Sequence, residues 1–490
     1  MHRHHVLLIT YPAQGHINPS LQLAKRLINL GARVTVSTTV HMHRRMSDKP
    51  SIRGLSFVPF SDGFDDGFTL SDDSNYDHYM TEYQRRSTEF VTDLINSAAE
   101  KGQHPFTCVV YTFLQNWVAE AARAFHLPSV VLWPQPAVLL DIHYFYFHGY
   151  RDYINEKITK EPSTCSLELP GLPPLKPSCD LPSFYLESNN STSKYRNSFI
   201  ASLIEKQFRH LDQEVKPRIL ANTFEALEPD ALRAVDDKLD VIPIGPLIPS
   251  AFLDIEKDGD GDSSYGGNIF KHSNDYVEWL DLQAERSVVY VSFGSFWVLA
   301  KKQMEEMARA LLDSRHPFLW VIRKKEKKEK EKEKEEEEDE ELSCREELEA
   351  RGKIVEWCSQ VEVLSHGSLG CFVTHCGWNS TMESLASGVP MVAFPQWVDQ
   401  KTNAKLIEDV WKTGVRVDRE EEEEEGVVEA GEIKRCLDVV MGSGEKAKEL
   451  RENADKWKRL AREAVKEGGS SEQNLRTFLH QVHDLLPQSR

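Results

Sequence analysis

Apolar and polar positions near the start of the chain follow a strand, helix, strand order. An apolar run at residues 5–10 ends in a Tyr-Pro-Ala-Gln-Gly turn, and Asn18 before Pro19 is typical of a helix start with proline at its first position. Leucines then recur at helical spacing until Gly31, and valines alternate through residues 32–38. This order predicts a βαβ unit and therefore a parallel sheet.

The second half of the chain repeats the same alternation. An apolar run at residues 287–295 ends in Phe-Gly-Ser, a helical pattern follows at 303–312, and a further strand is predicted at 318–322. The remaining strand-like runs are residues 370–374, 391–394 and 415–417. Periodicity predicts helices over roughly the last 70 residues. Two doubly wound α/β domains are therefore expected.

The segment between the two halves has the composition of a linker. Residues 247–275 contain prolines, an Asp-Gly-Asp-Gly-Asp stretch and paired glycines. The acidic stretch resembles the start of a calcium-binding EF-hand loop, but Ser263 stands where that loop needs glycine and Ile269 where it needs glutamate. We therefore expect a linker here and no metal site.

Composition excludes several classes of function. The chain has 490 residues and a formal net charge of -19, so it lacks the excess of Lys and Arg that nucleic-acid binding needs. No apolar run approaches the length of a membrane span, and the N-terminal one is too short for a signal peptide. The eight cysteines form no CxxC pair. We expect a cytoplasmic protein, with the charged runs at 323–341 and 420–425 solvated.

One turn between a predicted strand and helix carries most of the chemistry. The strand at residues 370–374 leads into His375-Cys-Gly-Trp-Asn-Ser, where a helix begins. Such a turn at the carboxyl end of a parallel strand is where α/β sheets bind ligands, and the helix N-terminus favours phosphate. Gly377 allows close backbone approach, while Asn379 and Ser380 add donors beside the imidazole of His375.

Simpler structural roles are available for the same residues. Ser380 and Glu383 have the spacing of a capping box, and His375 at a strand end is also typical of a structural histidine. Trp357 alone is typical of packing. The ligand site is favoured because aromatic, amide, histidine and carboxylate groups all fall on turns at one sheet edge.

Residues 357–400, from Trp-Cys-Ser-Gln to Trp-Val-Asp-Gln, resemble the signature of plant secondary-product glycosyltransferases, the UDP-glycosyltransferases of the GT-B fold. The resemblance covers nearly the whole chain, apart from the charged run and Glu356, where the family commonly has proline. It implies two Rossmann-like domains facing a central cleft. The expected divisions are an acceptor-binding domain at 1–246, the linker at 247–275, a UDP-sugar-binding domain at 276–470 and a helix at 471–490 that returns to the N-terminal domain.

The resemblance also assigns roles to single residues. Trp357 would stack on uracil, Gln360 would bind in the nucleoside region, and Glu383 would accept both ribose hydroxyls. The pyrophosphate would be held by His375, Asn379, Ser380 and Ser295, the sugar hydroxyls by Trp378, Asp399 and Gln400, and Cys358 and Gly377 complete the donor site. A final glutamine resembles glucose users. UDP-glucose would be a substrate, with no cofactor and no metal, since the helix dipole and His375 would balance the charge of UDP.

The same resemblance implies that His16 is the general base. It would accept the proton of a phenol or alcohol that attacks the anomeric carbon with inversion of configuration. The family commonly orients this histidine with an aspartate, but Thr112 stands at that position. Threonine cannot stabilise an imidazolium electrostatically, so either the pair is weaker or another acid serves, for which Asp141 is a candidate.

The acceptor is left open by the sequence. Residues 245–253 and 344–348 look like the subgroup that contains anthocyanin 5-O-glucosyltransferases and also enzymes that make glucose esters of plant hormones or crocetin. We expect transfer to a phenolic such as an anthocyanin or flavonoid by a monomer, with ester formation on a carboxylic acid as the alternative. The acceptor pocket is expected from residues 133–147 and 181–186, whose aromatic side chains also suit core packing.

Two remote alternatives belong to other classes. An NAD-dependent dehydrogenase would suit two doubly wound domains, but no Gly-x-Gly-x-x-Gly follows a predicted strand. An inactive UDP-sugar-binding protein is disfavoured because His16 and the whole donor signature are present.

Overall fold

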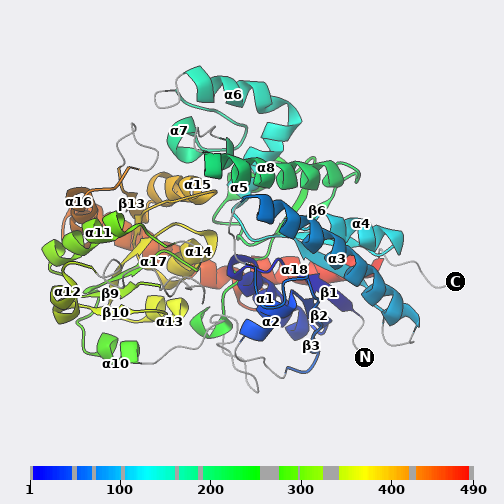
Figure 1. Ribbon diagram of the computed structural model, residues 1–490, viewed down its shortest axis with the longest axis horizontal. Helices are drawn as coiled ribbons and strands as arrows, with labels where there is room; N and C mark the ends of the chain where they lie inside the picture. Colours follow the sequence, from blue (N-terminus) through cyan, green and yellow to red (C-terminus); the bar gives the residue numbers. More distant parts are fainter. Residues whose placement is uncertain are drawn as a thin grey trace. The chain divides into compact units, whose positions relative to one another are not determined.

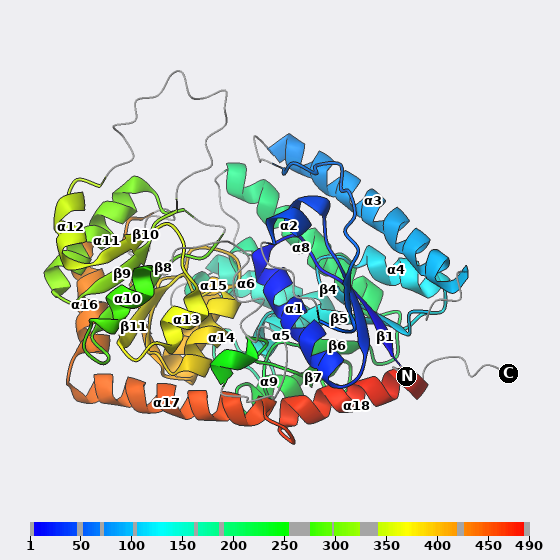
Figure 2. The ribbon, with the colours of Figure 1, turned by 90° about the horizontal axis from the view of Figure 1, so that it is seen from below.

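The computed structural model divides into two compact units, Met1–Ile269 with Leu460–Arg490, and Phe270–Arg459. Figures 1 and 2 show helices and strands of both units in two views. The structure describes residues 4–46, 52–68, 73–100, 105–160, 165–185, 191–253, 275–295, 298–323, 342–418 and 426–484. The acidic stretch of the expected linker and nearly all of both charged runs lie outside these residues.

The first unit is built on a seven-stranded sheet in the order β3-β2-β1-β4-β5-β6-β7, in which every pairing is parallel. The strands are β1 (His5–Ile9), β2 (Arg33–Ser37), β3 (Leu55–Phe57), β4 (Cys108–Thr112), β5 (Ser129–Trp133), β6 (Arg218–Ala221) and β7 (Asp240–Pro243). The strand order reverses between β1 and β4. Such a reversal opens a crevice at the carboxyl ends of the two strands, where open α/β sheets bind ligands.

The first helix begins earlier than its sequence pattern predicts. Helix α1 (Gln14–Asn29) starts after Ala13, so the predicted start at Asn18 and Pro19 is wrong, and Pro19 lies inside the helix. The physical reason is that the Ala13 carbonyl already accepts the backbone N–H groups of His16 and Ile17, at 2.9 and 3.0 Å. His16 therefore lies in the first helical turn and not in the loop before it.

The end of α1 follows the prediction. Gly31 has a φ of +89°, a left-handed conformation that glycine adopts without a Cβ penalty, and β2 follows directly. The other helices of this unit are α2 (Val40–Arg45), α3 (Asp73–Glu100), α4 (Trp117–Ala124), α5 (Ala137–Phe145), η1 (Tyr146–Tyr150), α6 (Arg151–Lys160), α7 (Pro177–Asp180), η2 (Ser183–Tyr185), α8 (Ser191–Leu211), α9 (Pro229–Ala234), η3 (Ser250–Leu253) and α18 (Ser470–Asp484).

Helix α18 is fixed to the segment that follows β7. The hydroxyl of Ser471 donates to the carbonyl of Gly245 at 2.7 Å, and the amide of Asn474 donates to Pro243 at 3.0 Å. The Arg26 guanidinium of α1 donates to the carbonyls of Ile244, at 2.8 Å, and of Pro246. The end of the chain and the first helix thus hold the same short segment.

The second unit carries a six-stranded parallel sheet in the order β10-β9-β8-β11-β12-β13. Its strands are β8 (Val288–Ser292), β9 (Phe318–Val321), β10 (Lys353–Val355), β11 (Leu369–Thr374), β12 (Met391–Ala393) and β13 (Gly414–Arg416). The predicted strands of the second half are confirmed to within a few residues. The strand order again reverses once, between β8 and β11.

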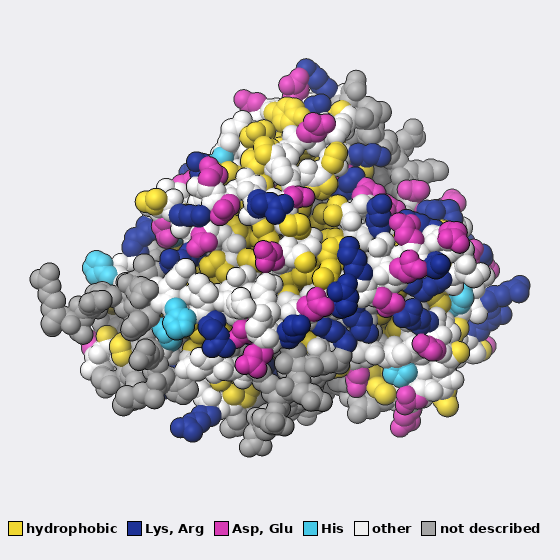
Figure 3. All heavy atoms as spheres, turned by 180° about the vertical axis from the view of Figure 1, so that it is seen from behind, with side chains coloured by type: hydrophobic (Ala, Val, Ile, Leu, Met, Phe, Trp, Pro, Cys, Tyr) yellow, Lys and Arg dark blue, Asp and Glu magenta, His cyan; other side chains and the backbone are white. Residues whose placement is uncertain are grey.

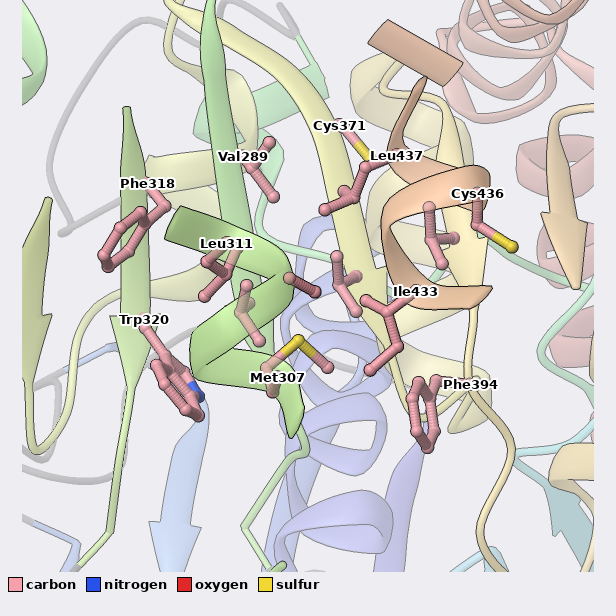
Figure 4. Close-up of a cluster of buried hydrophobic side chains, with 14 of the residues drawn as sticks. Val289, Met307, Leu311, Phe318, Trp320, Cys371, Phe394, Ile433, Cys436 and Leu437 are labelled. Atoms are coloured by element: carbon pink, nitrogen blue, oxygen red, sulfur yellow. The ribbon is translucent and has the colours of Figure 1, made fainter. Parts of the chain in front are cut away.

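Helices cover this sheet and bury its apolar side chains. Figure 4 shows Met307 and Leu311 of one helix beside Ile433 and Leu437 of another, with Val289 of β8 in the same cluster. The helices are α10 (Asp275–Asp281), α11 (Lys301–Ser314), α12 (Arg345–Arg351), α13 (Gln360–Ser365), α14 (Trp378–Ser387), α15 (Gln400–Lys405), η5 (Leu406–Val410), α16 (Ala430–Met441) and α17 (Glu445–Val465), which continues into the first unit. The helices predicted over the last residues are thereby confirmed.

Two sheets with parallel strands and flanking helices confirm the predicted α/β class with two doubly wound units. Over the described part of the chain, no helix has the length and apolar character that a membrane crossing requires. Figure 3 shows Lys and Arg side chains interspersed with Asp and Glu over the face seen from behind.

Candidate functional site

Residues predicted to bind a sugar nucleotide follow the carboxyl ends of four strands of the second sheet. Ser295 comes three residues after β8, Trp357 two residues after β10, and His375 directly after β11. Asp399 follows β12 after a short loop. Because the carboxyl ends of parallel strands meet at one edge, and β8 and β11 flank the reversal of strand order, the structure gathers these residues at the usual ligand crevice of such a sheet.

The turn after β11 opens the N-terminus of α14. Gly377 is the N-cap residue and makes no side-chain hydrogen bond to the helix, so the first turn of α14 is not capped from this position. Ser380 is the third residue of α14, and its hydroxyl accepts a hydrogen bond from Gln360 at 2.8 Å. The capping box that its spacing with Glu383 suggests is therefore not formed. An uncapped helix N-terminus is suited to an anion.

The imidazole of His375 lies between two glycines. A Cβ added to Gly377 would lie 2.5 Å from Nε2 of His375, and one added to Gly294 would lie 2.7 Å from the same atom. Gly294 also has a φ of +75°. Only glycine fits at either position, so the Phe-Gly-Ser turn after β8 and the turn after β11 close on the ring together.

Burial lowers the pKa of His375 to about 4. Its ring is therefore neutral at physiological pH, although a hydrogen bond with the backbone of Ser292 partly opposes the effect of burial on the pKa. In this state His375 offers a neutral N–H donor and no positive charge. The expectation that it balances the charge of a diphosphate needs an added proton, which a bound anion would favour.

Three predicted donor residues form one hydrogen-bonded group. Gln360 Nε2 donates to Glu383 Oε2 at 2.6 Å as well as to Ser380, and the hydroxyl of Tyr290 lies 3.5 Å from Gln360 Oε1. Burial raises the pKa of Glu383 to about 7. Cys358 adjoins this group, with its Sγ 3.4 Å from the Tyr290 hydroxyl, and burial raises the pKa of its thiol to about 12. The Cys358 thiol is therefore protonated at neutral pH, and the predicted place of Cys358 in the donor site stays a prediction.

Two of the residues predicted to bind the sugar, Gln400 and Trp378, contact other residues of the second unit. Gln400 Oε1 accepts the backbone N–H groups of Gln396 and Trp397 at 2.8 and 2.9 Å, which fixes the orientation of its amide. Trp378 is buried, with its ring centroid 6.0 Å from that of Trp411. Asn379, like Trp357, is half-buried at the same edge.

Asn403, which the sequence pattern does not single out, contacts the candidate site residue Asp399. Its amide Nδ2 donates to Asp399 Oδ2 at 2.7 Å and to the carbonyl of Cys376 at 2.8 Å. It is buried and joins α15 to the turn after β11. Its position one helical turn after Asp399 was the available signal, because residues four apart face each other on a helix.

The first unit holds a second group of candidates where its strand order reverses. His16 follows β1, and Thr112 ends β4. The imidazole of His16 lies against the ring of Phe113, with centroids 5.4 Å apart and planes 25° apart, and against Tyr11 at 5.4 Å. Its Nδ1 is buried and has no hydrogen-bond partner within the described ranges. Burial lowers the pKa of His16 to about 4.

Neither candidate for supporting His16 makes a hydrogen bond to it. The Thr112 hydroxyl accepts the backbone N–H of Tyr11 and the amide of Gln115, each at 2.9 Å. Asp141 is 1% exposed, and neither carboxyl oxygen has a hydrogen-bond partner in the part of the chain that the structure describes. Burial and the nearby Glu228 carboxylate raise the pKa of Asp141 well above its ordinary value.

The two segments expected to form an acceptor pocket do meet. His143 Nδ1 on α5 lies 2.7 Å from the hydroxyl of Tyr185 on η2, and both side chains are buried. A neighbouring cavity of about 420 Å³ is lined by Tyr146, Phe147, Gly149, Arg151, Asp152, Glu205, Phe208, Arg209 and Asp212. Among the described residues, no group of three His, Cys, Asp or Glu side chains is arranged to hold a metal ion.

The chain matches one family model and is similar over nearly its whole length to characterised glucosyltransferases. Residues 262–438 match the family model described as UDP-glucoronosyl and UDP-glucosyl transferase. The chain is 56% identical over 488 residues to phloretin 4'-O-glucosyltransferase of Malus domestica, with 98% of each chain covered. It is 52% identical to anthocyanidin 3-O-glucoside 5-O-glucosyltransferase of Verbena hybrida, covering 98% of this chain and 99% of the relative.

A solved structure shows the same architecture. The structure of Os79 from O. sativa in complex with UDP matches with a TM-score of 0.80 and 30% sequence identity, over 97% of this chain and 100% of the other. This match over almost the full length confirms the expected GT-B fold.

Proposed function

Because this chain belongs to the family of UDP-glucoronosyl and UDP-glucosyl transferases, we propose that it transfers glucose from UDP-glucose to a phenolic hydroxyl of a flavonoid-like acceptor. It is a UDP-glucose-dependent glycosyltransferase, and its relatives are named for phloretin and for anthocyanidin glucosides. The observation that carries the proposal is the gathering of the donor residues at the carboxyl edge of the second sheet, beside the uncapped start of α14.

The nucleotide would be bound by the group around Gln360. Trp357 supplies an aromatic face for uracil, and Glu383 accepts hydrogen bonds from the ribose hydroxyls. The bond from Gln360 to Glu383 supports this role because it holds the carboxylate in place before the ribose arrives. Two hydroxyl donors would favour the ionised carboxylate and lower its raised pKa.

The diphosphate would lie at the start of α14. Donors from His375, Asn379 and Ser380, together with Ser295 and the helix dipole, would stabilise the negative charge that develops on UDP as it leaves. In this proposal these groups act in place of a metal ion. Gly377 supports it, since its missing side chain lets the His375 imidazole lie against the start of α14.

The glucose would be held by Asp399 and Gln400, with Trp378 beside them. Since Gln400 Oε1 is occupied by two backbone N–H groups, its Nε2 is the atom left to donate to a sugar hydroxyl. The bond from Asn403 to Asp399 would orient that carboxylate for a second hydroxyl.

The chemical step would be a direct displacement. The acceptor oxygen attacks the anomeric carbon on the face opposite UDP, the bond from that carbon to the phosphate oxygen breaks, and its electron pair leaves with UDP. His16 takes the acceptor proton, a contribution that is typically worth about 10²–10⁴-fold in rate. The product from α-linked UDP-glucose is a β-glucoside.

We propose that residues 1–246 bind the acceptor and supply the general base, and that residues 276–470 bind UDP-glucose. Residues 247–275 would be the linker between them, and residues 471–490 would pack on the acceptor-binding domain. We also propose that the enzyme works as a monomer in the cytoplasm. In the described part of the chain none of the eight cysteines forms a disulfide bond, as expected in a reducing compartment, which supports this location.

The test is turnover of UDP-glucose with a panel of anthocyanins, flavonols and chalcones, measured by UDP release and by product linkage. Trp357→Ala and Glu383→Ala should weaken UDP binding, whereas Glu449→Ala on the surface of α17 should not. Absence of UDP release with every acceptor, or tighter binding of NAD than of UDP, would overturn the proposal.

A further inference from the structure

The helix that carries Gln360 begins without the cap that its sequence suggests. Ser359 is the N-cap residue of α13, and Glu362 three positions later has the spacing of a capping box. In such a box the glutamate accepts the backbone N–H of the N-cap residue, and the serine hydroxyl accepts a backbone N–H of the helix. The Ser359 side chain makes no cap hydrogen bond, and its backbone N–H donates instead to the hydroxyl of Tyr276 at 3.1 Å. The start of α13 is therefore held by a side chain 83 positions away.

The Tyr276 hydroxyl joins the two groups that a capping box would join directly. It accepts the Ser359 N–H and donates to Glu362 Oε2 at 2.6 Å, and these two hydrogen bonds form a hydroxyl relay. Tyr276 is fully buried. Burial and the hydrogen bond to Glu362 raise its pKa, so the hydroxyl stays protonated and keeps both roles. Because Ser359 is 3% exposed, water is a poor substitute for the acceptor that Tyr276 provides.

Helix α10 holds Tyr276 in place through contacts at both of its ends. At its first residue, Asp275 Oδ2 lies 2.5 Å from Lys353 Nζ of β10. At its last residue, Asp281 Oδ1 lies 3.1 Å from Nε2 of His366, which directly follows α13. Figures 1 and 2 show α10 beside α13 in both views. The hydroxyl of Tyr276 is thus presented to α13 by a helix that is itself fixed to the sheet.

A second tyrosine hydroxyl contacts the same turn from the sheet. Tyr290 of β8 is buried, and its hydroxyl lies 3.4 Å from Cys358 Sγ and 3.5 Å from Gln360 Oε1. Tyr290 therefore contacts the side chains on either side of Ser359, while Tyr276 holds the backbone at Ser359 itself. The direction of the Gln360 amide thus depends on both hydroxyls.

We propose that Tyr276 is a positioning residue for the nucleoside end of the donor, an inference that rests on the donor site proposed above. Through the hydroxyl relay it fixes the turn whose Trp357 would stack on uracil and whose Gln360 aligns Glu383 with the ribose. Tyr276 is buried and acts only through this turn. Loss of its hydroxyl releases the turn and weakens binding of the uridine part, while the groups at the start of α14 that bind phosphate stay in place.

The experiment is a calorimetric titration of the full-length enzyme and of Tyr276→Phe with UMP and with UDP. The phenylalanine keeps the ring and removes the hydroxyl, so the Ser359 N–H loses its acceptor. We expect both nucleotides to bind roughly five- to tenfold more weakly, by the same factor, because the loss lies in the part that they share. Gly377→Ala, at the phosphate end, should weaken UDP more than UMP.

Steady-state kinetics separate binding from chemistry. In Tyr276→Phe the KM for UDP-glucose should rise by the factor found for UDP, while kcat stays within about twofold of the wild-type value. The KM for the acceptor should not change. A variant that is merely less stable loses active enzyme, which lowers the apparent kcat and leaves both KM values unchanged.

Glu362 offers a second test that leaves Tyr276 intact. Glu362→Ala removes the acceptor of the tyrosine hydroxyl, whereas Glu362→Gln keeps an oxygen at the same place. The affinity for UMP should fall in Glu362→Ala and be retained better in Glu362→Gln. Since Tyr276→Phe and Glu362→Ala break one relay, their losses of affinity should be less than additive in the double variant.

Two controls remove contacts of the second unit that lie away from the turn. Asp281→Ala breaks the contact between α10 and the far end of α13. Arg451→Met removes a donor from the carbonyl of Gly442, at 3.0 Å, at the end of α16. That end lies at the amino edge of the sheet, since a Cβ on Gly370 of β11 would lie 2.9 Å from Cε of Met441. Neither control should change the affinity for UMP or UDP, and thermal unfolding measures the stability lost in each.

The outcomes separate this inference from the function on which it rests. Unchanged affinity for UMP and UDP in folded Tyr276→Phe, or a loss confined to UDP, overturns the inference and leaves the proposed function standing. An equal loss in Arg451→Met also overturns it, since general destabilisation would then explain the effect. If Tyr276→Phe does not fold, equal UMP affinity in Glu362→Ala and the wild-type enzyme overturns it instead. A wild-type enzyme that binds neither nucleotide overturns both the inference and the donor site.

Discussion

Gln360 donates its side-chain amide to the carboxylate of Glu383 at 2.6 Å, which links the start of α13 to the middle of α14. These residues are 23 positions apart, and the same amide also reaches Ser380. The bond aligns the carboxylate that is proposed to bind ribose while leaving it buried. Burial removes water from the ionised carboxylate and raises the pKa of Glu383, and the single hydrogen bond from Gln360 offsets this effect only in part.

Glu383→Gln should flatten the dependence of stability on pH. The pKa of Glu383 is raised from 4.5 to about 7, so its ionisation favours the unfolded chain as pH rises from about 4.5 to 7. Replacement by glutamine should remove a loss of about 3 kcal/mol over that range, taken as an upper bound. Thermal unfolding of both proteins at pH 5 and pH 8 measures this. An equal pH dependence in the two proteins would show that Glu383 is ionised throughout.

Gly377→Ala should weaken UDP binding through His375. The added Cβ would lie 2.5 Å from Nε2 of that ring, so the imidazole must move away from the start of α14. We expect at least a tenfold loss of affinity, about 1.4 kcal/mol, in a calorimetric titration with UDP. The control is Gly431→Ala, where a Cβ meets nothing within 4 Å. Unchanged affinity in Gly377→Ala would remove His375 from the phosphate site.

Asn403→Ala should affect the sugar more than the nucleotide. The variant removes the amide that donates to Asp399 Oδ2 and to the Cys376 carbonyl. The loss of each of these buried hydrogen bonds should lower the free energy of unfolding by about 1–3 kcal/mol. We expect a higher KM for UDP-glucose with a smaller change in the affinity for UDP. Asn453→Ala, which removes an exposed bond to Lys412 in the same unit, is the control. Equal effects on UDP and UDP-glucose would place Asn403 in a purely structural role.

Arg26→Met should destabilise the first unit. Its guanidinium donates to the carbonyls of Ile244 and Pro246, and hydrogen bonds from a charged donor contribute about 1.5–3 kcal/mol. Chemical denaturation should report a loss of this order. Arg233→Met, which breaks an exposed pair with Asp230, should cost less than about 1 kcal/mol. A similar cost for both variants would mean that the segment after β7 is held mainly by α18.

From the residues alone, the first βαβ unit, five strands of the second sheet and the turn after β11 could be predicted. These features depend on local patterns, such as alternating valines, leucines at helical spacing, and glycines at turns, which act within a few residues. The predicted start of α1 at Asn18 is nevertheless wrong. The Ala13 carbonyl accepts the backbone N–H groups of His16 and Ile17, so the helix already begins after Ala13.

Which side chains meet could be seen only once the whole chain was folded. The bond from Gln360 to Glu383, the bond from Asn403 to the Cys376 carbonyl and the bond from the Tyr11 backbone to Thr112 depend on how segments that follow separate strands converge at a sheet edge. A buried polar group takes whatever partner the packing brings within hydrogen-bond distance. That partner is fixed by the arrangement of the whole sheet and not by the residues beside it in the chain.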